Sequence, residues 1–175
     1  TEATTQNQSM IDGVTQSLGA TLVAGDSGFE YYNFVRSVAD QYTASVNRAA
    51  SGLNGVSRVF DMVIPTSMDI TLPEAIRKNL NSSDQKAAID YMYGSLSTQV
   101  TPVPVFDTLK AHNGEYIYFR TDHHWTARGA YYGYREYAAL AGMDPVPLNQ
   151  FETKSYDGFL GAFYSETGKK PALGN

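Results

Sequence analysis

The most regular hydrophobic pattern in the sequence lies between residues 35 and 53, where apolar residues recur at intervals of three and four. This spacing places them along one face of an α-helix, as a single stripe to bury. The members of the stripe are Val38, Ala39, Tyr42, Val46, Ala49, Ala50 and Leu53. Asn54-Gly55 follows directly, and glycine commonly ends a helix. The pattern predicts a helix over residues 35–53.

A different pattern, nearly continuous and rich in β-branched residues, runs from Val56 to Ile64. It is typical of a strand covered on both faces, as in a parallel sheet. Residues 21–24 and 29–34 flank the turn-forming segment Gly25-Asp26-Ser27-Gly28, which predicts a hairpin or a strand followed by a loop. Shorter strands are predicted at residues 103–105 and 116–119.

Three further helices are predicted from their start signals. Pro73 begins a short one, Ser82-Ser83-Asp84-Gln85 offers an N-cap for a helix reaching Leu96, and Thr126 can cap a helix that ends at Gly142. Strands that alternate with helices imply parallel strands joined by right-handed crossovers. We therefore predict an α/β fold of three layers, with a mostly parallel sheet and helices on both of its faces.

Composition narrows the class of protein. The 175 residues are enough for a single domain spanning 1–175, with a polar, glycine-rich extension at 143–175. The absence of cysteine excludes disulfides and thiol catalysis, and the net charge of -5 argues against a nucleic-acid partner. No apolar run approaches the roughly 20 residues that span a bilayer, so we expect no membrane segment, and any N-terminal anchor to have been lost.

The densest polar cluster is the segment Arg120-Thr121-Asp122-His123-His124-Trp125-Thr126, between a predicted strand and a predicted helix. Ligands of open α/β sheets bind beyond the carboxyl ends of strands, where this segment falls. Asp122 and His124 point to the same side of an extended segment, so the carboxylate can hold one imidazole nitrogen while the other faces a substrate. These are the acid and base of a hydrolytic triad. Alternatively, Asp122 and Thr126 only cap the helix and the histidines cover surface.

Metal binding by His123 and His124 is a rival chemistry. Adjacent side chains on an extended chain point to opposite faces, which makes it difficult for both to reach one ion. The sequence offers no second cluster with ligand spacing, and His112 stands beside Asn113-Gly114. We therefore predict neither a metal nor another cofactor.

The run from Tyr118 to Thr126, followed by Gly129-Ala130-Tyr131-Tyr132, resembles the signature of the bacterial DHHW family. That family is similar to the SGNH-hydrolase-like domains of alginate O-acetyltransferases. The similarity extends from about the first strand through Phe159-Leu160-Gly161. It implies an SGNH-like form of the predicted fold, in which Asp122 and His124 belong to a Ser-His-Asp triad.

In these relatives the nucleophilic serine lies in a later Gly-Asp-Ser-like segment, and none follows His124. The resemblance therefore implies that the nucleophile and the last strand and helix lie outside this chain. It also implies an extracytoplasmic bacterial acyl esterase or O-acetyltransferase acting on a cell-surface or exported polysaccharide. A different class stays open, which is a non-catalytic glycan-binding or structural module of the cell envelope.

Ser27 is a possible substitute for the missing nucleophile. Ordinary SGNH hydrolases place Gly-Asp-Ser after the first strand, with the serine amide contributing to an oxyanion hole. Gly25-Asp26-Ser27 is also a common turn composition, and we favour the turn. Ser67 lies in Pro65-Thr66-Ser67, at the end of the strand predicted for residues 56–64. It has no motif around it and is predicted to line the cleft.

Tyrosine is over-represented, with 13 Tyr against 8 Phe and 1 Trp. Aromatic rings stack on the faces of sugars, so those near the predicted site are candidates to contact a glycan. Tyr134 and Tyr137 fall instead on the helix face expected to pack on the sheet. Arg120 is predicted either to bind an anionic group of the substrate or to pair with an acidic residue. The full set of predicted substrate-binding residues is Arg120, His123, Trp125, Tyr131 and Ser67.

Overall fold

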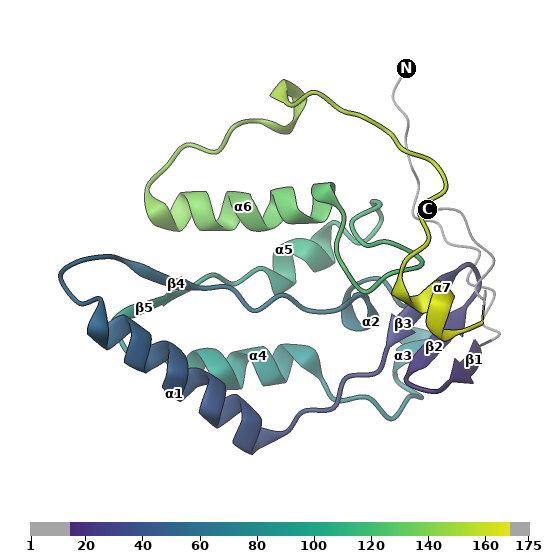
Figure 1. Ribbon diagram of the computed structural model, residues 1–175, viewed down its shortest axis with the longest axis horizontal. Coiled ribbons are helices and arrows are strands. Elements are labelled where there is room, and N and C mark those ends of the chain that lie inside the picture. Colours follow the sequence, from purple (N-terminus) through teal and green to yellow (C-terminus); the bar gives the residue numbers. More distant parts are fainter. Residues whose placement is uncertain (1–14, 169–175) are drawn as a thin grey trace.

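The computed structural model describes residues 15–168, in which helices lie on both sides of a short parallel pair of strands (Figure 1). In this pair β4 (Val59–Asp61) runs alongside β5 (Val100–Pro102), with Val59 opposite Val100. Helices α1 (Arg36–Gly52) and α4 (Gln85–Gly94) cover one face. Helix α6 (Ala127–Ala141) covers the other, with α5 (Phe106–Ala111) packed beside it.

A separate antiparallel sheet is formed by β1 (Thr15–Leu18), β2 (Thr21–Ala24) and β3 (Ser27–Glu30). The last two are joined by a two-residue turn that needs a positive φ at Gly25, +58°. The predicted hairpin is therefore confirmed. Helix α7 (Ala162–Glu166), which comes late in the chain, packs against β3 (Figure 1).

The α/β class is confirmed, and the described residues form two small sheets where one mostly parallel sheet was predicted. Their sheets are one antiparallel and one parallel, and both are small. The expected strand at 56–64 is reduced to β4, the part that pairs with β5, and Val56 before it is 82% exposed. The expected strand at 116–119 contributes a single antiparallel bridge between Tyr118 and Trp125. The strand expected at 103–105 lies slightly earlier, as β5.

The predicted helices α1, α4 and α6 all form. Asp84 caps α4 by accepting a hydrogen bond from Ala87 N, and Thr126 Oγ1 accepts one from Gly129 N at the start of α6. Gly142 ends α6 with a φ of +76°. Shorter helices also form: α2 (Ser67–Ile70), α3 (Glu74–Arg77) and the 3-10 helix η1 (Leu148–Gln150). The apolar stripe of α1 is only partly buried, since Val38 is 60% exposed.

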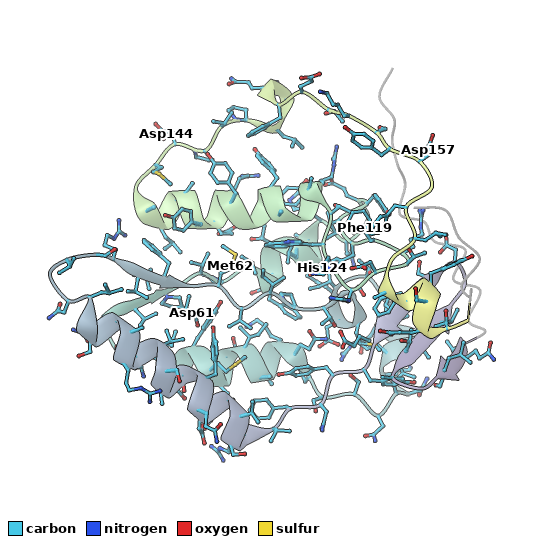
Figure 2. All side chains as sticks on the ribbon, viewed as in Figure 1. Asp61, Met62, Phe119, His124, Asp144 and Asp157 are labelled. Atoms are coloured by element: carbon cyan, nitrogen blue, oxygen red, sulfur yellow. The ribbon has the colours of Figure 1, made fainter. Side chains whose placement is uncertain are left out.

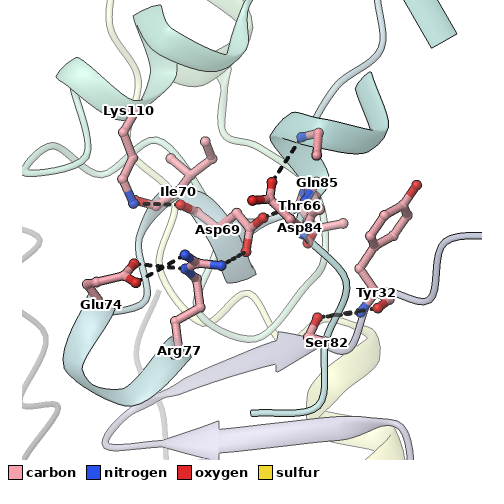
Figure 3. A network of polar contacts seen from close by, with 11 residues as sticks. Tyr32, Thr66, Asp69, Ile70, Glu74, Arg77, Ser82, Asp84, Gln85 and Lys110 are labelled. Atoms are coloured by element: carbon pink, nitrogen blue, oxygen red, sulfur yellow. Dashed lines mark hydrogen bonds and ion pairs between the residues drawn. The ribbon is translucent and has the colours of Figure 1, made fainter. Parts of the chain in front are cut away.

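A buried polar network connects α2, α3, α4 and α5 (Figure 3). Its centre is the carboxylate of Asp69, which accepts a hydrogen bond from Gln85 N (2.8 Å) and forms an ion pair with Arg77 (3.4 Å). Lys110 Nζ donates to the backbone oxygens of Asp69 (2.6 Å) and Ile70 (3.1 Å). Burial of Lys110 lowers the pKa of its ammonium group. The Asp69 carboxylate is thus paired with Arg77, and the Lys110 ammonium is hydrogen-bonded to backbone oxygens, as charges removed from water require.

The main hydrophobic core lies between α6, α5 and the parallel pair. Its buried members are Ile70, Val103, Val105, Leu109, Ile117, Tyr118 and Tyr132. Tyr137 adds an edge-to-face contact with Phe60, with ring centroids 5.0 Å apart, as expected for the helix face that packs on the sheet. Because Ile117 and Tyr118 belong to this core, the polar segment that follows them starts from a fixed position.

After α6 the chain crosses over that helix as an extended segment and returns to the N-terminal sheet at α7 (Figure 1). The side chains of residues 151–160 are all exposed. The expected extension at 143–175 is described as far as residue 168, and its last seven residues lie outside the described part. Over residues 15–168, no helix has the length and hydrophobicity needed to cross a bilayer.

Candidate active site

Residues 121–124 form a tight bend at the start of α6, and His124 lies beside the first turn of that helix (Figure 2). Two backbone contacts close the bend: the bridge between Tyr118 and Trp125, and a hydrogen bond from Phe119 N to His124 O (3.2 Å). Asp122 is 8% exposed at the base of the bend. The local chain therefore presents its polar side chains from a fixed loop.

Asp122 and His124 form the pair that the sequence predicts. Asp122 Oδ1 accepts a hydrogen bond from His124 Nδ1 (2.6 Å) and another from His124 N (3.0 Å). The His124 side chain is 67% exposed, so its second ring nitrogen, Nε2, is left to face solvent or a substrate. A carboxylate that fixes one imidazole nitrogen and leaves the other accessible is the arrangement of a general base.

The second carboxylate oxygen of Asp122 is held by the far end of the chain. Asp122 Oδ2 accepts a hydrogen bond from Ala162 N (3.0 Å), at the first residue of α7. Burial raises the pKa of the Asp122 carboxyl, but the hydrogen bonds from Ala162 and His124 outweigh it and hold the pKa below its usual range. Asp122 is therefore kept ionised beside His124.

Gly161 makes this contact with α7 possible. A Cβ atom at that position would lie 2.4 Å from Asp122 Oδ2 and 2.6 Å from Thr121 O, distances that no side chain tolerates. Gly161 N also donates to Thr121 Oγ1 (3.1 Å), and Phe163 N donates to Thr121 O (3.0 Å). Our sequence reasoning missed these residues as part of the site. A glycine so far along the chain carries no local signal, because only the folded chain brings it to Asp122.

His123 lies on the same side of the bend as His124, with ring centroids 4.1 Å apart. The prediction that these side chains point to opposite faces is wrong, because residues 121–124 are bent and not extended. His123 Nδ1 is 3.8 Å from Asp122 Oδ1, and its side chain is 45% exposed. One ligand atom from each of the three residues lies within 4.8 Å of the others. His123 and His124 can therefore both face a single ion, contrary to the prediction.

The two candidate serines lie in neighbouring parts of the fold. Ser27 begins β3, whose Gly28 N donates to Arg120 O (2.8 Å), and its hydroxyl donates to Asp26 Oδ1 (2.8 Å). Ser67 is 2% exposed at the start of α2, and its hydroxyl has no hydrogen-bond partner within residues 15–168. Ser27 is thus engaged with its own turn, and Ser67 is buried and not at an open cleft.

Arg120 and Trp125 have structural contacts on either side of the bend. The Arg120 guanidinium pairs with Asp26 (Nε to Oδ2, 3.2 Å) and lies over the Tyr116 ring at 5.1 Å. The Trp125 indole packs against α6, where a Cβ on Gly133 would lie 2.8 Å from the ring. The structure therefore places Trp125 in helix packing, while Arg120 connects the bend to the N-terminal hairpin.

A cavity of about 560 Å³ lies beside the first half of α6, between the helix and the segment that crosses over it. Its aromatic lining comes from Tyr131, Tyr134 and Phe151, and its charged lining includes Arg128 and Lys154. Tyr131 contacts Phe151 with ring centroids 6.0 Å apart. Tyr131 thus lies where a ligand can reach it, and Tyr134, expected to pack on the sheet, lines the same cavity.

A second carboxylate–histidine pair lies just before the bend. Glu115 Oε1 is 2.7 Å from His112 Nδ1 and accepts a hydrogen bond from Tyr132 OH (2.8 Å), while Oε2 pairs with Arg128 (2.5 Å). Burial raises the pKa of Glu115, and the bonds from Arg128, Tyr132 and His112 lower it below its usual range. The His112 ring stacks on Tyr132 at 3.8 Å. Both sides of this pair are occupied by other side chains.

Comparisons with known proteins match these features to one family. The family model described as "DHHW protein" matches residues 2–175. No curated protein matches the sequence. A crystal structure of a DHHW family protein from Eubacterium siraeum has a TM-score of 0.81 and 29% identity, over 89% of this chain and 51% of that one.

Two structures of Bacillus cereus PatB1 also match. The one with a sulfonyl adduct has a TM-score of 0.61 at 18% identity, over 74% of this chain and 45% of that one. The other has a TM-score of 0.62 at 16% identity, over 86% of this chain and 52% of that one. This chain therefore spans about half the length of the structures it matches, and the PatB1 likeness shows a related fold.

Proposed function

This chain belongs to the DHHW family, and from that premise we propose that it carries the acid–base half of a Ser-His-Asp acyl esterase or O-acyltransferase. The observation that carries the proposal is the 2.6 Å hydrogen bond from His124 Nδ1 to Asp122 Oδ1, made by a ring that is 67% exposed. The bond fixes the imidazole tautomer, and the exposure gives Nε2 access to a reacting group.

In the proposed reaction, His124 Nε2 accepts a proton from a serine hydroxyl while the serine oxygen bonds to the carbonyl carbon of an ester. Asp122 keeps its hydrogen bond to Nδ1 and stabilises the imidazolium without taking a proton. The imidazolium then returns its proton to the leaving alkoxide as the tetrahedral intermediate collapses to an acyl-enzyme. Water or a sugar hydroxyl attacks that acyl group by the same steps, which releases an acid or an acylated sugar and frees the serine.

We propose that the nucleophilic serine belongs to the part of the full-length protein that this chain does not include. Support comes from the structural neighbours, of whose length this chain spans about half. Ser27 is the weaker candidate, because its hydroxyl is directed at Asp26 Oδ1. By the same reasoning, β4 and β5 begin a larger parallel sheet of SGNH type, which would give the three-layer form of the fold.

The substrate that we propose is an acylated polysaccharide outside the cytoplasm. Support comes from the cavity beside α6, whose walls include Tyr131, Tyr134 and Phe151. Aromatic faces of this kind suit the apolar faces of sugar rings. Arg128 lines the same cavity and lies four residues after His124 in the sequence.

The test is hydrolysis of a chromogenic acetate by the full-length protein. We expect His124→Ala to lower kcat by at least about a thousandfold, His123→Ala to keep a much larger fraction, and His112→Ala to keep the parental rate. A sulfonyl fluoride should label one serine, located by mass spectrometry. Equal losses in the His123 and His124 variants, or an inactive parent protein, would overturn the proposal.

The cavity also favours a second candidate, a non-catalytic glycan-binding module. The two candidates differ in their dependence on His124, because binding in the α6 cavity needs Tyr131 and Phe151 and does not need the imidazole. A full-length protein that binds polysaccharide in an affinity gel but hydrolyses no acetate ester would establish the second candidate and exclude the first.

A further inference from the structure

The bend at residues 121–124 brings three potential metal ligands together on one exposed surface. We propose that Asp122, His123 and His124 bind a divalent transition-metal ion of the Zn²⁺ type. One ligand atom from each residue lies within 4.8 Å of the others, and the histidine side chains are 45% and 67% exposed. The site is therefore open to a hydrated ion, which would fill its remaining positions with water.

The distances between the ligand atoms are suitable for a single ion. Ligands at about 2.0–2.2 Å from tetrahedral zinc are separated from one another by about 3.4 Å. Asp122 Oδ1 is 2.6 Å from His124 Nδ1 and 3.8 Å from His123 Nδ1, so these separations bracket that value. The three ligand atoms lie within 4.8 Å of one another and both rings are exposed, so rotations of the two histidine side chains would adjust these separations to an ion. The ion would replace the proton that now bridges Asp122 and His124.

The carboxylate is already oriented for this role. Its Oδ2 is fixed by Ala162 N (3.0 Å), and Gly161 allows α7 to approach closely. Outer hydrogen bonds of this kind hold ligating carboxylates in place and strengthen metal binding. Two imidazoles with one carboxylate favour zinc, nickel, copper or cobalt, whereas calcium and magnesium prefer oxygen ligands only.

A metal ion at this site would also affect catalysis, an inference that rests on the proposed function. An ion bound to Asp122 and His124 removes the hydrogen bond that orients the imidazole, so the metal would inhibit the esterase. His123 is the residue that separates the two activities, because the proposed triad uses Asp122 and His124 and the metal site adds His123 as its third ligand.

The first experiment measures metal binding directly. Calorimetric titration of the metal-free chain with ZnCl₂ should show one site with a micromolar dissociation constant. His123→Ala and His124→Ala should each weaken it at least tenfold, while His112→Ala, the matched control at the second carboxylate–histidine pair, should bind like the parent. Ca²⁺ should give no binding heat. Unchanged affinity in the folded His123 variant, or equal binding of Ca²⁺, would overturn the proposal.

A second experiment separates this inference from the proposed function. Inhibition of the full-length protein by ZnCl₂ should require about tenfold more metal in His123→Ala, each rate being compared with that variant's own metal-free rate. If the protein binds Zn²⁺ in the calorimeter but hydrolyses no ester, the metal-site proposal stands and the esterase proposal fails. If it hydrolyses the ester but binds no Zn²⁺, the esterase proposal stands and the metal-site proposal fails.

Discussion

Two carboxylate–histidine pairs, Glu115 with His112 and Asp122 with His124, lie within thirteen residues of each other and have nearly the same bond length, 2.7 and 2.6 Å. They differ in their surroundings. The His112 ring is stacked on Tyr132 and 33% exposed, while the His124 ring is 67% exposed. A hydrogen bond between a carboxylate and one imidazole nitrogen is therefore not enough for a general base, because the second ring nitrogen must also be accessible.

The carboxylates differ in the same way. Glu115 is bonded to the side chains of Arg128 and Tyr132, which belong to α6, and of His112, which follows α5. Asp122 is held by backbone N–H groups: Ala162 N donates to Oδ2, and His124 N donates to Oδ1, the oxygen that also bonds the imidazole. These surroundings suit the first pair to structural stabilisation and the second to the proton transfer that we propose.

The largest expected difference between the pairs is in catalysis. Asp122→Asn in the full-length protein should lower kcat for an acetate ester by about 10⁴-fold, since the amide no longer selects the correct imidazole tautomer. Glu115→Gln, its matched control, should leave kcat essentially unchanged. Steady-state kinetics on both variants would measure this. Similar losses in the two would show that the pairs do not differ in function.

A smaller effect is expected from the backbone that holds Asp122. Gly161→Ala should displace α7 from the carboxylate, because the new Cβ would lie 2.4 Å from Asp122 Oδ2. We expect kcat to fall by about 10²-fold and the free energy of unfolding to fall by about 1–3 kcal/mol. Gly114→Ala, beside Glu115, is the matched control, since no atom lies within 4 Å of its added Cβ. Kinetics and urea unfolding of both variants test whether α7 supports the site.

The smallest expected effect concerns stability at the Glu115 pair. Glu115→Gln should lower the free energy of unfolding at pH 7 by about 1 kcal/mol, through loss of bonds to the charged carboxylate. Because the pKa of Glu115 is lower in the folded protein, its contribution is present above the unfolded pKa and is lost as pH falls through the folded one. Urea unfolding of both proteins should thus show a difference that shrinks as the pH falls through the range in which Glu115 is protonated. A difference that grows on acidification would contradict this origin.

Much of the local structure followed from the sequence. Helix α6 begins at Thr126 and ends at Gly142 because a hydroxyl cap and a residue with positive φ act within a few positions of the chain. The pairing of Asp122 with His124 followed for the same reason, since the two residues are nearly adjacent. The strands were predicted less well. Short strands such as β4 depend on their partners, and three residues of Val56–Ile64 pair in the described chain.

What the sequence determined by itself is which groups can meet over short distances: the helix caps, the hairpin turn at Gly25 and the bond between Asp122 and His124. Packing of the folded chain sets which carboxylate–histidine pair is covered and which is open. It also brings Gly161 and Ala162 against Asp122 and turns His123 toward His124. The physical reason is that burial and backbone contacts across forty residues arise from packing, which no local pattern specifies.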